Sequence, residues 1–154
     1  MNASTPPSLA AQLTSAAPLE TPPDAREFLM RALKLEGMAC MLDEDRDIAF
    51  RLEEFSYCLR VFDSDPEFAQ LVLPHFLSVD AADDLAGLLV LADRVSSRVK
   101  NVKFFSARSG DQVALHASAD FLVPDTRQLA SVLPRAAAAL ACAVRDFRTL
   151  RRLM

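Results

Sequence analysis

Glycine is scarce in this sequence, which has only Gly37, Gly87 and Gly110 among its 154 residues. Phosphate loops and dinucleotide-binding turns need several closely spaced glycines, because the backbone must approach the phosphates closely. The common nucleotide-binding motifs are therefore excluded. The GxSxG motif of serine hydrolases is also absent.

Histidine is also scarce, with only His75 and His116 in the chain. A zinc site or a general base needs partner residues within ligand or hydrogen-bond distance. His116 alternates with Leu115 on a predicted strand, so we expect it on the more exposed face of the sheet, in a structural or surface role. Ser97 and Lys100 fit an S-x-x-K pattern, but the companion motifs of the serine enzymes with that pattern are missing. We therefore predict no catalytic residues, no cofactor and no metal.

The three cysteines, Cys40, Cys58 and Cys142, are widely spaced and lie in apolar contexts. Free cysteine usually behaves as a small buried hydrophobe, so we predict reduced, buried thiols. An odd number of cysteines also argues against an oxidising compartment.

Positive charge is in the minority, with 17 Lys and Arg against 21 Asp and Glu and a net charge of −4. Nucleic-acid affinity depends on Lys and Arg against phosphate, so an acidic chain is a poor candidate for it. The first ten residues contain no Lys or Arg, and no signal-peptide apolar run follows them. The apolar stretch over residues 85–92 is far shorter than the roughly 20 residues of a spanning helix. We predict a cytoplasmic protein without nucleic-acid or membrane partners.

The composition changes at about residue 23. Residues 1–23 are rich in Ala, Ser, Thr and Pro and carry a single charged side chain. Such a segment buries too little apolar surface to offset its ordering entropy, so we predict a flexible tail over 1–23 and a single domain over 24–154. A helix is expected to begin at Asp24, with Glu27 at the capping-box spacing, and to end at Gly37. Its apolar face is predicted to comprise Phe28, Leu29, Ala32, Leu33 and either Leu35 or Glu36.

The next forty residues alternate between apolar and polar side chains. This period of two is typical of strands with one buried face. We predict four strands joined by acidic turns, over residues 38–42, 48–52, 55–61 and 68–73. Pro74 is expected to end the fourth strand or to mark a sheet edge.

The second half of the domain mixes both periods. An apolar stripe preceded by acidic residues predicts a helix that begins at Asp80. Two strands follow over 102–107 and 112–121, and residues 109–111 form the hairpin turn between them.

A long final helix is predicted after Asp125, which caps it. Pro134 removes one backbone hydrogen bond, so we expect either a kink or a second helix that starts near Ser131. The predicted order is α-β-β-β-β-α-β-β-α. Hairpins dominate, so the fold class is α+β with an antiparallel sheet, and helices on one face would leave the other face partly open.

One acidic segment has partial calcium-loop spacing. Asp43, Asp45, Asp47 and Glu54 match four of the ligand positions of a helix-loop-helix calcium site. The position that requires glycine holds Ile48, and the flanking segments are predicted strands rather than helices. We therefore interpret the segment as a solvated acidic hairpin turn.

Two further features indicate interaction surfaces. Arg145, Arg148, Arg151 and Arg152 form a basic patch near the C-terminus, which either compensates the helix dipole or docks an acidic partner. Adjacent apolar residues on a strand point to opposite faces, so one of each adjacent pair is either exposed for a partner or covered within the monomer. The predicted protein-interaction residues are Phe62, Phe104, Phe105, Arg145, Arg148 and Arg152.

Residues 37–121 resemble the YbjN family of proposed bacterial sensory-transduction regulators. The segments that carry the resemblance are DIAFRLEEFSYCLRVFDSDP, DDLAGLLVLADRVSSRVKNVKFF and DQVALHASADF, followed by a long closing helix. The family typically has two asparagines three residues apart at the helix–strand junction, where this chain has Asp93 and Ser96. The resemblance implies a fold similar to class I type III secretion chaperones, which are α+β dimers that bind unfolded segments of other proteins. It also implies a regulatory or stress-linked role in bacteria, without enzymatic activity.

Three functional hypotheses follow. The first is a non-enzymatic, homodimeric protein-binding regulator of the YbjN type. The second is a secretion chaperone with a dedicated client. The third is a small-ligand sensor or an enzyme, which would need a deep pocket that gathers His116, Asp120 or residues 94–103.

Overall fold

The structure, a computed structural model, describes residues 24–80, 85–122 and 126–154. The tail predicted over 1–23 and the predicted cap at Asp125 lie outside these residues. The observed element order is α-β-β-β-β-α-β-β-α, as the sequence predicts.

Helix α2 (Ala25–Leu35) begins and ends where expected. The Asp24 side chain accepts a hydrogen bond from the backbone N–H of Arg26 at 3.1 Å and so caps the helix. Gly37 follows the helix with a φ of 80°, the left-handed conformation that glycine adopts readily.

The buried side of α2 is narrower than predicted. Leu29 and Leu33 are buried, one turn apart, but Leu35 in the last turn is exposed. Glu27, expected to complete a capping box, accepts a hydrogen bond from Arg31 at 3.0 Å.

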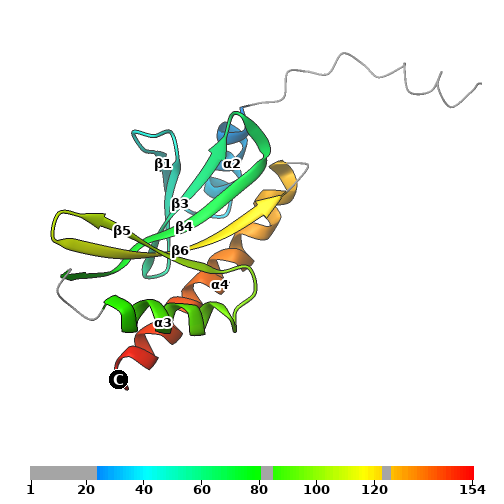
Figure 1. Cartoon of the computed structure of the whole chain (residues 1–154). Helices are drawn as coiled ribbons and strands as arrows, with labels where there is room; N and C mark the ends of the chain where they lie inside the picture. The colour runs from blue at the N-terminus through cyan, green and yellow to red at the C-terminus, as the bar shows by residue number, and fades with distance from the viewer. Residues whose placement is uncertain (1–23, 81–84, 123–125) are drawn as a thin grey trace, which may run out of the picture.

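Six strands form one antiparallel sheet in the order β1-β2-β3-β4-β6-β5 (Figure 1). The predicted hairpins are present, and Glu53 takes a positive φ of 54° in the tight turn between the second and third strands. The strands are β1 (Cys40–Leu42), β2 (Ile48–Leu52), β3 (Phe55–Phe62), β4 (Asp65–Asp80), β5 (Lys103–Ser109) and β6 (Gln112–Leu122).

Strand β4 is much longer than the predicted 68–73, and Pro74 does not end it. The pairing of β4 with β6 shifts register between Leu73 and Leu77. His75 within this irregularity has a φ of 50°. A bulge leaves a residue out of the hydrogen-bond ladder, so proline is tolerated there without the loss of a ladder bond.

Asp80 is the last residue of β4 rather than the first of a helix. It pairs with Gln112 of β6, whose side-chain amide donates to the Asp80 carboxylate. Helix α3 (Leu85–Ser96) follows. Asp93 is exposed on α3 and Ser96 is half-buried.

Helices α2, α3 and α4 (Thr126–Arg151) lie on one side of the sheet (Figure 1). A single cluster of buried side chains joins them to the sheet. The Tyr57 hydroxyl donates to the carbonyl of Ala137 at 3.1 Å, which ties β3 to the middle of α4. The largest fully buried apolar side chains are Phe147, Leu29, Ile48, Leu59, Leu71, Leu115 and Leu140.

Helix α4 is one helix over 26 residues, with Pro134 exposed inside it. The predicted second helix near Ser131 is therefore wrong. The solvent side of the helix tolerates the proline because water can satisfy the carbonyl group left without its partner. No helix in the described ranges is long and apolar enough to cross a membrane.

Candidate functional site

The face of the sheet opposite the helices, here called the outer face, is the first candidate site. Side chains alternate between the two faces of a strand. Ala49, Cys58, Val72, Ser118 and Lys103 are paired in one row across five strands. Their neighbours two residues along each strand share this outer face.

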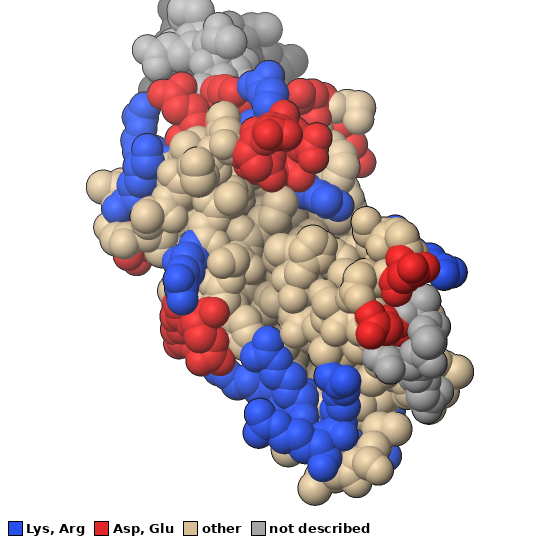
Figure 2. Space-filling model, turned by 90° about the vertical axis from the view of Figure 1, so that its left-hand side faces the viewer, with Lys and Arg blue, Asp and Glu red and all other residues tan. Residues whose placement is uncertain are grey.

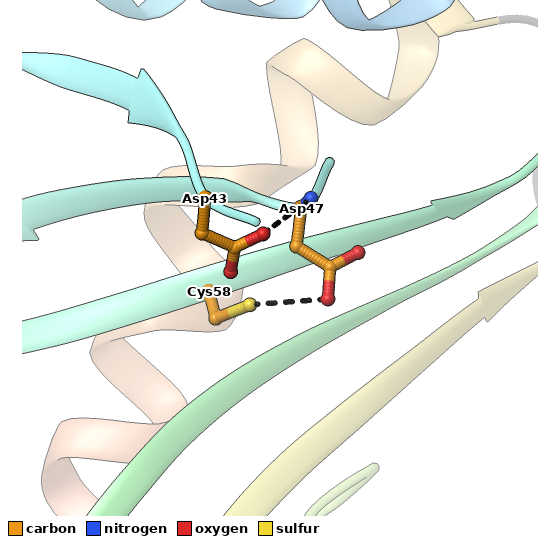
Figure 3. A group of neighbouring side chains, drawn as sticks. All are labelled: Asp43, Asp47 and Cys58. Carbon is orange, nitrogen blue, oxygen red and sulfur yellow. Dashed lines mark hydrogen bonds between the residues drawn. The ribbon is translucent and has the colours of Figure 1, made fainter. Parts of the chain in front are cut away.

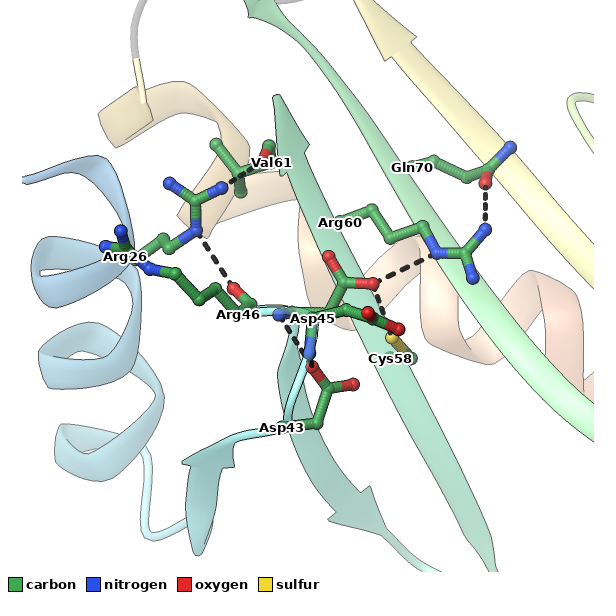
Figure 4. Close-up of polar contacts among 9 residues, drawn as sticks. Arg26, Asp43, Asp45, Arg46, Cys58, Arg60, Val61 and Gln70 are labelled. Carbon is green, nitrogen blue, oxygen red and sulfur yellow. Dashed lines mark hydrogen bonds and ion pairs between the residues drawn. The ribbon is translucent and has the colours of Figure 1, made fainter. Parts of the chain in front are cut away.

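A ladder of polar side chains crosses the outer face. Arg60 Nε donates to Asp47 Oδ2 at 3.1 Å, and Arg60 Nη1 lies 3.5 Å from Gln70 Oε1 (Figure 4). Gln70 Nε2 in turn donates to Asp120 Oδ1 at 2.9 Å, and the Lys103 ammonium donates to Asp120 Oδ2. Partial burial opposes ionisation of Asp120, but the hydrogen bonds from Lys103 and Gln70 outweigh it and lower its pKa. The ladder runs from the start of β2 to β5.

An aromatic cluster lies on the outer face beside this ladder. The Phe105 ring stacks on the His116 ring, with centroids 4.9 Å apart and planes inclined by 9°. His75 lies on another side of His116 at 4.6 Å, and its backbone N–H donates to His116 Nδ1 at 3.3 Å. His116 is therefore on the predicted face but is only 7% exposed, because these neighbours cover it. Burial, followed by the influence of His75 and Arg60, lowers its pKa.

An apolar cluster occupies a different part of the outer face. Phe62 and Phe68 lie with ring centroids 5.3 Å apart, and Leu122 is paired with Phe68. Phe62 is 36% exposed and Leu122 is 81% exposed. The outer face therefore presents two groups of apolar or aromatic side chains with the polar ladder between them.

The adjacent pair Phe104 and Phe105 divides between the two faces. Phe105 is 37% exposed on the outer face. Phe104 is half-buried on the helix side, where its ring lies 5.4 Å from Phe76 and 5.7 Å from Phe147. Of the two, only Phe105 is available to a partner on the outer face. Alternation alone predicts the division but not which ring faces out.

The basic patch is the second candidate site. Figure 2 shows Lys and Arg side chains gathered at the lower end of the molecule, where α4 ends in Figure 1, and acidic side chains gathered at the upper end. Arg145 pairs with Glu53 at 2.9 Å and with Glu54 at 3.0 Å. Arg145 and Arg148 both lie 5.4 Å from the centroid of the Phe55 ring. Two arginines of the predicted patch, Arg145 and Arg148, thus lie against the Phe55 ring at the β2–β3 turn.

A cavity of about 340 Å³, here called the basic cavity, opens beside this patch. Sequence reasoning found its arginines but missed its apolar lining, because Pro74 was expected to end the strand that supplies Phe76. The backbone carbonyl of Phe76 accepts a hydrogen bond from Arg148 at 3.2 Å, which ties the two sides together. The lining residues are Phe76, Leu77, Phe147, Arg148, Arg151 and Arg152.

A group of three potential metal ligands, Asp43, Asp47 and Cys58, lies near the β1–β2 turn (Figure 3). Asp43 Oδ1 accepts backbone hydrogen bonds from Asp45 at 3.0 Å and Asp47 at 2.8 Å, and so shapes the turn. Cys58 Sγ lies 3.6 Å from Asp47 Oδ2, which also accepts from Arg60. These carboxylate oxygens already hold protein donors.

Burial, with the two carboxylates adding to it, raises the pKa of Cys58 to about 11. A thiol that stays protonated is a poor nucleophile at neutral pH. The prediction of three buried cysteines is wrong in part. Cys40 and Cys58 are half-buried and Cys142 is exposed on α4, although all three are free.

The acidic segment forms a hairpin turn. The backbone N–H of Asp43 donates to the carbonyl of Asp47 at 2.9 Å, and Ile48 is fully buried at the start of β2. Glu54 lies at the other end of β2, where it pairs with Arg145. The four acidic residues with calcium-loop spacing therefore do not converge on one point.

Four cavities of about 190, 220, 310 and 340 Å³ indent the described part of the molecule. Neither His116 nor Asp120 lines any of these four. Lys100 and Asn101 line the cavity of about 220 Å³, between β6 and α4. Val95 and Arg98 line the cavity of about 190 Å³. Residues 94–103 therefore contribute to two of the four cavities, but none of the four gathers them with His116 or Asp120.

Comparison with known proteins identifies the fold. No protein-family model matches the chain, and no curated protein matches it. The crystal structure of YbjN from E. coli, a proposed transcription regulator, superposes with a TM-score of 0.65 at 11% identity, over 82% of this chain and 92% of that one. A chain of the HopA1–SchA chaperone–effector complex superposes with a TM-score of 0.58 at 15% identity, over 86% of this chain and 99% of that one. The chain therefore has the YbjN-like, chaperone-like fold that the sequence predicts.

Proposed function

We propose that this chain is a non-enzymatic protein-binding regulator of the YbjN type, which acts as a homodimer and binds a segment of another protein on its outer face. The observation that carries the proposal is the outer face itself. Helices α2, α3 and α4 cover the other side of the sheet, and Phe62, Leu122 and Phe105 stay exposed on this one. Exposed apolar groups gathered on one face mark interaction sites.

The outer face is ordered before a partner arrives. Gln70 and Asp120 of the ladder bond to each other, and Phe105 is held flat against His116. Side chains that are already fixed lose little conformational entropy on binding. The two clusters lie on either side of the ladder. A partner segment that crosses the ladder would therefore place one apolar side chain on each cluster.

Helix α3 supplies the surface that we propose for the homodimer. Leu89 is 42% exposed and Val90 is 70% exposed, although α3 buries its opposite side in the core. Ala86, one turn earlier, is also exposed. Two copies of this apolar side related by a twofold axis would cover one another, as an isologous interface requires.

Site-specific photocrosslinking in the native host tests partner binding on the outer face. A photoreactive phenylalanine at position 105 or 62 is expected to form crosslinks to the same partner. The same group at position 31, on the exposed side of α2, is the matched control. Crosslinks that are equally frequent from all three positions, or absent from 105 and 62, would contradict the proposal.

A dedicated secretion-type chaperone is the second candidate, favoured by the superposition on a chaperone–effector complex. Both functions place the protein in a bacterial cytoplasm. They differ in where the partner is encoded. A chaperone would yield a single crosslinked client encoded beside its own gene, whereas a stress or sensory regulator would yield a partner encoded elsewhere.

A further inference from the structure

The basic cavity combines an apolar floor with a positively charged rim. The rings of Phe76 and Phe147 meet edge to face in the floor, with centroids 5.3 Å apart. Leu77 adds aliphatic surface. The rim consists of Arg148 and Arg151 from the last turns of α4 and of Arg152 directly after it. The site is therefore amphipathic, with charge of one sign.

Among the residues that the structure describes, none forms an ion pair that compensates the charge of this rim. Arg145, one turn earlier, is neutralised by Glu53 and Glu54. Neither Arg151 nor Arg152 has an ion pair with any residue in the described ranges. Arg148 donates to a backbone carbonyl and lies over the Phe55 ring.

Helix-dipole compensation does not explain three unpaired arginines. The C-terminus of a helix carries only about half a negative charge. Three guanidinium groups exceed that by roughly two and a half positive charges. The excess is concentrated at one cavity of a chain whose net charge is −4.

We propose that the basic cavity binds an acidic segment of a partner protein that carries one bulky apolar side chain beside its carboxylates. The apolar side chain lies on Leu77 and on the exposed edge of Phe76, above the fully buried Phe147 ring, and the carboxylates pair with Arg148, Arg151 and Arg152. Guanidinium groups bind carboxylates through paired, charge-assisted hydrogen bonds. This inference rests on the proposed protein-binding function and names one class of partner for it.

Size and charge favour a peptide over a membrane surface. A cavity of about 340 Å³ lies at the small end of the range of roughly 300–1,000 Å³ for ligand sites, which suits one side chain and its neighbours. Binding to anionic lipid headgroups usually takes a cluster of about 4–8 basic residues. The rim has three unpaired ones, on a chain that is acidic overall.

Fluorescence anisotropy with two labelled peptides tests the inference on the full chain. The first peptide is Gly-Asp-Glu-Phe-Glu-Asp, and the second replaces its Phe with Ala. The double variant Arg151→Gln/Arg152→Gln removes two rim charges without adding negative charge at the helix end. Arg135→Gln, at an exposed position of the same helix, is the matched control.

The Phe-containing peptide is expected to bind the wild-type chain and the Arg135→Gln variant with equal affinity. The Arg151→Gln/Arg152→Gln variant loses two exposed charge contacts. Its dissociation constant for the Phe-containing peptide is therefore expected to be about fivefold higher or more. The Ala-containing peptide is expected to bind more weakly to wild type. No measurable binding, equal binding by the double variant, or equal binding of both peptides would overturn the inference.

Two further arms test other occupants of the cavity. Co-sedimentation with phosphatidylglycerol vesicles that the double variant abolishes, without peptide binding, would assign the cavity to a membrane surface. A lower solution mass of the double variant would assign it to the acidic turns of a second copy. Crosslinking from Phe105 that persists in the double variant would show that the outer-face function stands even where the cavity inference fails.

Discussion

The ring of Phe105 covers the ring of His116, 4.9 Å away and nearly parallel to it. His116 is thereby buried on the face opposite helices α2, α3 and α4, between Phe105 and His75. A stacked aromatic ring cannot solvate a positive charge as water does. The pKa of His116 is lowered by this burial first, and by His75 and Arg60 after it.

The first prediction concerns pH. Unfolded histidine titrates at about 6.5. The folded chain disfavours protonation of His116, so its contribution to stability is present above that pH and is lost as the pH falls toward the lowered pKa. The thermal unfolding temperature is expected to fall between pH 7 and pH 5. Thermal melts followed by circular dichroism measure this fall.

The His116→Gln variant is the matched test of this prediction, because its side chain is neutral at every pH. Its unfolding temperature is expected to change little between pH 7 and pH 5. Asp63 and Asp120 also have lowered pKa values, but carboxylates lose their stabilising charge below about pH 4, outside this window. An unchanged pH dependence in His116→Gln would refute the assignment.

The second prediction concerns Arg26, which is buried within α2 and bonds to the β1–β2 turn, to the end of β3 and to the turn that follows β3. Its guanidinium donates to the carbonyls of Arg46 and Val61 (Figure 4). It also donates to the Asp63 carboxylate. Arg26→Met is expected to cost about 2–3 kcal/mol in the free energy of unfolding, because it removes charged hydrogen bonds and leaves buried acceptors without donors.

Urea denaturation measures this loss, and Asp63→Asn is the control. Asp63 is exposed, so water replaces its contact with Arg26, and its replacement is expected to cost clearly less. A loss in Asp63→Asn as large as that in Arg26→Met would show that the ion pair, rather than the two carbonyl contacts, dominates.

Arg26 also shows what the sequence leaves open. The period of two in residues 48–52 and 55–61 predicts β2 and β3 closely, because alternation is a property of neighbouring residues. The burial of Arg26 depends on partners 20, 35 and 37 residues away. No local pattern encodes such partners, and a charged residue at a helix start is expected in solvent.

The sequence predicts the arginines of the basic cavity but not its apolar floor, because only the arginines are neighbours along the chain. The arginines lie within eight residues of one another, so their clustering on α4 follows from the sequence. The floor depends on β4 continuing past Pro74, which requires the bulge between Leu73 and Leu77. Proline usually ends a central strand, and only the pairing with β6 shows that this one does not.

The third prediction concerns self-association through α3. The wild-type chain is expected to have twice its monomer mass of 16.9 kDa in solution. Leu89→Asp/Val90→Asp is expected to be monomeric, because each charge would be buried in the interface without a partner. Both side chains are exposed in the monomer, so its thermal unfolding is expected to stay cooperative.

Light scattering on a size-exclusion column measures the mass of the full chain and of a chain that begins at Asp24. Leu122→Asp is the control, because Leu122 is as exposed as Val90 but lies on the outer face. A monomeric wild type would contradict the homodimer. A monomeric Leu122→Asp with a dimeric α3 variant would move the interface to the outer face.

The last prediction concerns the two unlike thiols of Cys58 and Cys142. Only the thiolate reacts with alkylating reagents. The pKa of Cys58 is raised to about 11, first by burial and then by Asp47 and Asp43. Cys142 is exposed on α4. At pH 8, iodoacetamide is expected to modify Cys142 rapidly and Cys58 at least tenfold more slowly, by roughly the tenfold that each unit of pKa represents.

Mass spectrometry of the Cys142→Ser variant isolates the slow site from the fast one. Asp47→Asn in that background removes one negative charge and the carboxylate that accepts the Cys58 thiol at 3.6 Å. The thiolate then lacks its repelling neighbour, so Cys58 is expected to react faster. If Asp47→Asn leaves the rate unchanged while denaturant raises it, burial alone protects the thiol, and the carboxylates beside it serve only to shape the β1–β2 turn.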